Sequence, residues 1–177
     1  MEQAIRGLLK LDGGSVNPKH ASVQGNNVPV SPNQSPETYF GLAEADDFDN
    51  AQPLNSGRMT FTPTGDLPAS AWTLGGTWNV GDESITAVSN ATLYMNFAAK
   101  NVYTVGGAPK PTNITVLING VPVSQAGDAG GDVHNSQVTM SIPTLYRIVS
   151  LPTFSSNDTI ELEVPAGVSL NTFTFGS

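Results

Sequence analysis

The sequence predicts an all-β fold, a two-layer antiparallel β-sandwich of the jelly-roll type, and three observations carry this prediction. From the first tryptophan onward, apolar and polar residues alternate at a period of two; Leu93, Met95 and Phe97, for example, are separated by single residues. Gly, Asn and Asp break the runs at regular intervals, as turns do between antiparallel strands. Apolar residues do not recur there at the spacing of three and four that a helix requires.

The N-terminal part differs in character from the rest of the chain. Residues 2–11 are expected to form a short amphipathic helix, because Ile5, Leu8 and Leu9 share one face and an Asp-Gly-Gly sequence follows. The next stretch is rich in Pro, Asn and Gly, which is the composition of a linker. The expected organisation is a helix over 1–11, a linker over 12–36 and a β-sandwich binding module over 37–177.

Within the β-domain we expect eight to ten short strands and no helix. The stretch 72–105 holds both tryptophans and is expected to form a β-meander, one wall of the sandwich. Asn119-Gly120 predicts a two-residue hairpin turn. The other expected strands are 59–62, 114–118, 121–123, 138–142, 145–151, 160–164 and 168–175.

The composition of the sequence argues against several classes of function. Charged residues make up 12% of the 177 residues, against roughly 25% in an average globular domain. A net charge of −8 without a basic patch argues against a nucleic-acid partner. The chain has no cysteine, so it cannot supply a disulfide, a thiolate metal ligand or a thiol nucleophile. No apolar run approaches the roughly 20 residues of a transmembrane segment.

An ordered series of short motifs gives the β-domain a resemblance to a known family. The motifs are TYFG at 38–41, WTL at 72–74, GTWNVG at 76–81, NVYTVG at 101–106, LINGVP at 117–122, LYRIV at 145–149 and the closing segment 167–176. Together they resemble the C-terminal carbohydrate-binding-module-like domain of DipZ-type thiol-disulfide interchange proteins. The resemblance runs from residue 37 to the end of the sequence.

The resemblance implies a galactose-binding-like β-sandwich outside the cytoplasm, whether periplasmic, bound to the cell envelope or secreted. In that family the domain follows a thioredoxin-like body, so the helix at 1–11 resembles the remnant of such a body's last helix. The Cys-x-x-Cys pair of the redox domain is absent from this sequence. No redox activity therefore carries over to this chain.

Exposed aromatic rings and amides are the groups that a sugar-binding surface needs, because rings stack on pyranoses and amides bond hydroxyls. Tyr94 and Asn96 lie on the face opposite Leu93, and Trp72 and Trp78 lie near the ends of expected strands. These four are the candidate ligand-binding residues, the ligand being a glycan or another cell-envelope component. The alternative for both tryptophans is a place in the core.

Clustered acidic residues give a candidate calcium site. Asp46, Asp47 and Asp49, or Asp128 and Asp132, could supply oxygen ligands to Ca²⁺. Neither stretch has the pattern of an EF-hand loop, and solvated loop carboxylates are the alternative interpretation. No other cofactor is expected.

No complete catalytic set is present, so we expect a non-catalytic protein. Glu161 and Glu163 could be taken for a glycosidase carboxylate pair, but they alternate with Ile160 and Leu162 as a solvent-facing strand edge does. Two hypotheses of different classes stay open. The first is a carbohydrate- or ligand-binding module; the second is a structural, self-assembling subunit of a surface layer or filament.

The N-terminal helix gives the first testable prediction. Its apolar stripe is too short to persist alone in water, and we expect it to dock on a second copy of the chain. Leu8→Asp should then lower the association state in sizing chromatography and leave the melting temperature of the β-domain nearly unchanged. A drop of several degrees in a strict monomer would instead place the helix on the sandwich.

Overall fold

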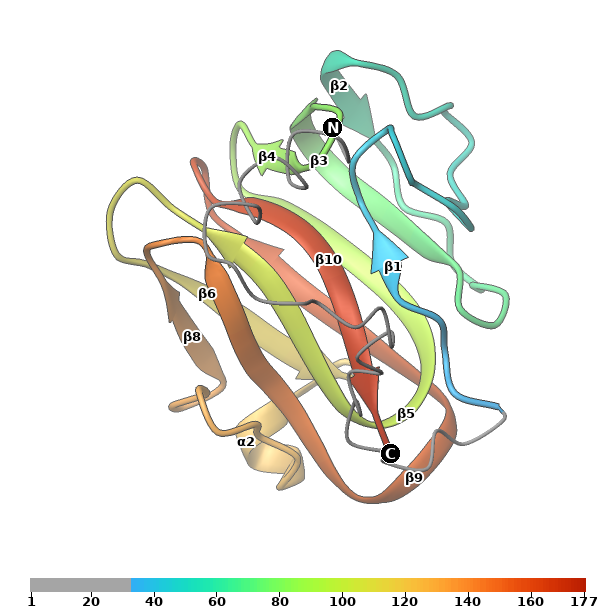
Figure 1. The fold of residues 1–177 in the computed structure, drawn as a ribbon, viewed down its shortest axis with the longest axis vertical. Coiled ribbons are helices and arrows are strands. Elements are labelled where there is room, and N and C mark those ends of the chain that lie inside the picture. Colours follow the sequence, from blue (N-terminus) through green and yellow to red (C-terminus); the bar gives the residue numbers. More distant parts are fainter. Residues whose placement is uncertain (1–32) are drawn as a thin grey trace, which may run out of the picture.

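The computed structural model describes residues 33–177, so the helix predicted over 1–11 and most of the linker over 12–36 lie outside the described residues. Within that range the chain forms ten strands and one helix of four residues, α2 (Val123–Ala126), as Figure 1 shows. The all-β class is confirmed. The strands are β1 (Thr38–Tyr39), β2 (Gly57–Phe61), β3 (Trp72–Val80), β4 (Ile85–Ala87), β5 (Ala91–Gly107), β6 (Thr112–Ile118), β7 (Val121–Pro122), β8 (Gln137–Met140), β9 (Thr144–Val164) and β10 (Ser169–Gly176).

All ten strands are hydrogen-bonded into one sheet. The order is β1-β10-β4-β3-β5-β9-β6-β7, with β2 on β3 and β8 on β6, and every pairing is antiparallel. In addition β5 pairs with β10, so that β3, β5, β10 and β4 form a closed ring of pairings. A flat sheet cannot close such a ring, and the sheet therefore curls around its own inner face.

Two long strands carry this curl. Strand β5 pairs with β3 through residues 92–95 and with β10 through residues 101–107, while β9 pairs with it from one end to the other. Each strand thus belongs to two regions of the sheet that face each other across the core. The sequence predicted separate strands at 145–151 and 160–164, and the structure joins them into the single strand β9.

A break in the alternation of β5 marks the place where the sheet bends. Ala99 and Val102 are both buried, and the two residues between them, Lys100 and Asn101, are both half-buried. The register between β5 and β9 shifts at this point. An extra residue in one strand kinks it and moves the inward face to the other parity, so both halves of β5 present apolar side chains to the same core.

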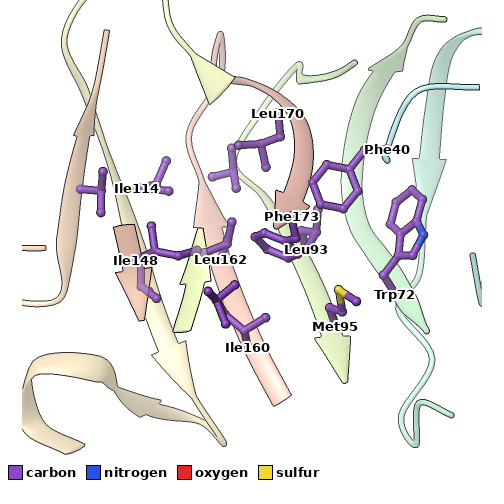
Figure 2. Packing of buried hydrophobic residues seen from close by; sticks show 14 of the residues in the cluster. Phe40, Trp72, Leu93, Met95, Ile114, Ile148, Ile160, Leu162, Leu170 and Phe173 are labelled. Carbon is purple, nitrogen blue, oxygen red and sulfur yellow. The ribbon is translucent and has the colours of Figure 1, made fainter. Parts of the chain in front are cut away.

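The core fills the space inside the curled sheet as one cluster, with Ile114 and Ile148 at the opposite end from Trp72 (Figure 2). Trp72 and Trp78 are both fully buried. The ring of Trp72 lies 5.0 Å from that of Phe40 and 4.7 Å from that of Phe48, centre to centre. Large aromatic side chains bury more apolar surface than any others, and rings at such distances attract each other further.

Both indole nitrogens find partners inside the protein. Nε1 of Trp72 donates to the backbone oxygen of Asp46 at 2.8 Å, and Nε1 of Trp78 donates to that of Gly75 at 3.0 Å. The expectation that these two rings reach a loop surface is therefore corrected. They are core residues, as the alternative interpretation had it, and neither offers a face to a ligand.

The segment after the Asn119-Gly120 turn also differs from the expected strand over 121–123. Asn119 and Gly120 both have positive φ, 50° and 77°, as a two-residue hairpin turn needs. Strand β7 then ends at Pro122, and Val123 begins α2, which Gly127 ends in the left-handed conformation. Proline is well suited to precede a first helical turn, so the chain leaves the sheet after two residues.

The buried aromatic cluster gives a second prediction. Trp72→Ala should lower the free energy of unfolding by about 3–5 kcal/mol, because it leaves a large cavity among Phe40 and Phe48. Tyr39→Ala, an exposed position in the neighbouring strand, should cost less than about 1 kcal/mol. Urea denaturation measures both, and equal losses would contradict the assignment of Trp72 to the core.

Candidate functional site: a groove on the outer face of the sheet

A groove of about 480 Å³ lies across β3, β5, β9 and β6. Strand register places Gly75, Thr92, Glu163 and Thr115 side by side in one row, one residue from each strand. The neighbours of Thr92, Glu163 and Thr115 along their strands are buried, so this row faces away from the core. Four strands thus build the floor of one site.

The groove exists because β3 carries two glycines at this point. A Cβ on Gly75 would lie 2.5 Å from Oγ1 of Thr92 and 3.2 Å from Cδ of Pro63. Gly76 has a φ of 84°, where any other residue would be strained. With no side chain on either residue, the floor stays open beside Thr92.

The segment between β1 and β3 passes next to Gly75, and Asn50 holds this segment in place on β3. Oδ1 of Asn50 accepts hydrogen bonds from the hydroxyl of Thr73 at 2.8 Å and from the backbone N–H of Leu74 at 2.9 Å. Its Nδ2 donates to the backbone oxygen of Thr62 at 2.6 Å. Because these bonds fix the segment on β3, Pro63 lies next to Gly75, outside the residues that line the groove.

Tyr94 occupies the next row of the same outer face, between Thr73 and Glu161. It is half-buried. Burial, and next a hydrogen bond with Glu161, raise the pKa of its phenol above the ordinary value, and the negative charges of Glu161 and Glu163 add to the effect, while a hydrogen bond with Thr92 opposes it. Two of these partners, Thr92 and Glu163, belong to the groove row, so Tyr94 is in contact with the edge of the groove.

Asn96, the fourth predicted ligand-binding residue, has a structural role in this conformation. Its Nδ2 donates to the backbone oxygen of Leu67 at 3.1 Å and to Oδ1 of Asn157 at 2.8 Å. These bonds tie two loops to the outer face of β5 beyond Tyr94. None of the four predicted residues lines the groove, and Tyr94, in the row next to Thr92, lies nearest to it.

The predicted calcium ligands do not converge. Asp46 and Asp47 are exposed, and their backbone oxygens accept hydrogen bonds from Trp72. Over residues 33–177, no group of three carboxylate or imidazole side chains lies close enough to hold a metal ion. The backbone oxygen of Asp128 accepts from the N–H of Ser150 at 2.9 Å, and Oδ2 of Asp132 accepts from the backbone N–H of Arg147 at 2.8 Å.

Sequence reasoning missed most of the groove. Thr92, Thr115 and Asn113 belong to none of the predicted motifs, and for Glu163 the sequence indicates a solvent-facing strand residue in preference to a catalytic one. The alternation of each strand shows that these side chains face outward. What brings them together is the register between strands far apart in the sequence, which the sequence alone does not reveal.

Comparison with known proteins identifies a matching family and two relatives. A family model described as "Thioredoxin like C-terminal domain" matches residues 35–176. Protein DipZ from Mycobacterium bovis and Protein DipZ from Mycobacterium tuberculosis are each 27% identical over 146 residues, which is 80% of this chain and 18% of each relative. The chain thus spans less than a fifth of the length of these relatives. In the part of the chain that the structure describes, no helix is long and apolar enough to cross a membrane.

The environment of Tyr94 gives a third prediction. Because its pKa is raised in the folded protein, the folded state holds this proton more tightly than the unfolded chain. That contribution to stability is complete below the unfolded pKa of about 10 and is lost as pH rises through the folded value. Tyr94→Phe should therefore lose less stability than the wild type between about pH 9 and pH 11.

Urea denaturation at several pH values in this range measures the difference. Tyrosinate absorbance provides an independent reading, because Tyr94→Phe should remove a component that titrates late. The same alkaline decline in both proteins, together with no change in the late component, would contradict the described environment of this phenol.

Proposed function

Because the chain belongs to the family of thioredoxin-like C-terminal domains, we propose that it is a non-catalytic, extracytoplasmic module that binds a carbohydrate-like ligand. The family match and the two DipZ relatives confirm the resemblance that the ordered motifs predicted. In a longer protein the module would stand beside a thiol-disulfide redox domain. This chain has no cysteine, so any redox step would belong to that other domain.

The finer fold assignment is part of this proposal. We take the curled sheet to be a two-layer sandwich of the jelly-roll, galactose-binding-like kind. The closed ring of β3, β5, β10 and β4 and the single core support it, since a two-layer sandwich buries the inner faces of both layers in one core.

The groove is the observation that carries the binding proposal. Its floor presents the hydroxyls of Thr92 and Thr115 and the carboxylate of Glu163 within one row. Hydroxyl and carboxylate oxygens are suitable partners for the hydroxyls of a sugar. The half-buried ring of Tyr94 borders the row and could pack against the apolar face of a pyranose.

The arrangement of Glu161 and Glu163 does not favour cleavage of a glycosidic bond. Glu161 and Glu163 lie two residues apart on one strand and face the same side. A glycosidase places its two carboxyl groups on opposite sides of the scissile bond, which neighbouring positions on one strand face do not do. We therefore propose a module that holds a ligand and does not cleave it.

A substitution that fills the groove tests the proposal. Calorimetric titration against a panel of neutral and charged oligosaccharides, with Ca²⁺ and with a chelator, should find at least one ligand that binds in both conditions. Thr115→Trp should weaken that binding about tenfold or more, because the indole would occupy the floor between Glu163 and Asn113.

The matched control is Thr174→Trp, a half-buried threonine on β10, which contributes nothing to the groove. This variant should keep the affinity of the wild type. Absence of binding to every panel member in a folded sample would contradict the carbohydrate proposal. Equal weakening by both substitutions would contradict the placement of the site in the groove.

A further inference from the structure

We propose that the groove selects ligands that carry an amine, and specifically amino sugars over neutral and acidic ones. This inference rests on the proposed function, since it names the class of sugar that the same groove would take.

The charge around the groove has one sign. Glu163 stands in its floor, and Glu161 stands in the next row of β9 on the same face. None of the basic residues in the described chain lines the groove. These residues are Arg58, Lys100, Lys110 and Arg147.

The Glu163 carboxylate is free to accept bonds from a ligand. Within residues 33–177, it takes part in no hydrogen bond or ion pair with another side chain or with the backbone. Asn113, at the rim, differs: its amide donates to Gln137 at 3.2 Å and accepts from Thr139 at 2.7 Å. The carboxylate is therefore the strongest unoccupied acceptor in the groove.

An ionised carboxylate only accepts hydrogen bonds. Bonds from a charged donor such as an ammonium group are roughly twice as strong as bonds between neutral groups. An ammonium group near Glu163 would also be attracted by Glu161, while the acid group of a uronic sugar would be repelled by both.

The hydroxyls of the floor argue for a sugar as the carrier of the amine. Thr92 and Thr115 flank Glu163 in the same row, one on each neighbouring strand. A sugar amine is surrounded by ring hydroxyls that can bond both threonines while the amine meets the carboxylate. A lysine side chain offers the ammonium group alone and would leave the two threonine hydroxyls without ligand partners.

Three oligosaccharides of equal length test the inference: a glucosamine oligomer with free amines, its fully N-acetylated counterpart, and an oligogalacturonate, each titrated near physiological salt. The free amine should bind about tenfold or more tightly than the acetylated form, and the oligogalacturonate should not bind. Glu163→Gln should bring the affinities for the free amine and for the acetylated form to within about twofold of each other.

The control variant is Glu83→Gln, an exposed position in the turn before β4 that makes the same change in net charge. It should keep the preference of the wild type. Trilysine is the control ligand and should bind far more weakly than the amino sugar.

The outcomes separate this inference from the proposed function. Binding of the acetylated oligomer without a preference for the free amine would overturn the inference and leave the binding module standing. Equal loss of preference in Glu83→Gln and Glu163→Gln, or trilysine binding as tightly as the amino sugar, would also overturn it. If no oligosaccharide binds, the proposed function fails together with the inference.

Discussion

The pairing of β5 with β9 is the constraint on which the rest of the structure depends. These strands of 17 and 21 residues stay paired through the bend, so each contributes to both regions of the curled sheet. Every other strand pairs with β5 or β9, or pairs with a strand that does. The same pairing sets Thr92 beside Glu163 on the outer face. The register between β5 and β9 therefore determines both which side chains enter the core and which line the groove.

At the bend of the β5–β9 pair the register shifts, and some backbone groups lose the hydrogen-bond partners of a regular ladder. Ser35 supplies them: its N–H donates to the backbone oxygen of Ala98 at 2.8 Å, and its hydroxyl accepts from the N–H of Ala98 at 2.9 Å. Asn50 does the same for Leu74, where β3 passes from β5 to β2. Buried backbone groups without partners are costly, so two polar side chains stabilise the two irregular points of the sheet.

The sequence predicted the local features well, because alternation and turn residues act over a few positions. The meander after Trp72, the Asn119-Gly120 hairpin and the outward-facing glutamates of β9 all follow from such short patterns. It predicted the site poorly. The local pattern leaves Trp72 and Trp78 open between core and binding surface, and the distant segments that cover them place them in the core. The groove depends on Gly75 meeting Thr92 across two strands, and no local pattern encodes that meeting.

We propose that the outer face of β3, β5, β9 and β6 holds a ligand. Amide chemical-shift mapping of the full chain during titration with its tightest-binding oligosaccharide locates the bound ligand. We expect the largest shifts on Gly75, Thr92, Thr115 and Glu163, and no shifts for residues of β1 and β10. Shifts centred on the hollow beside Tyr39, with the groove row unmoved, would contradict it.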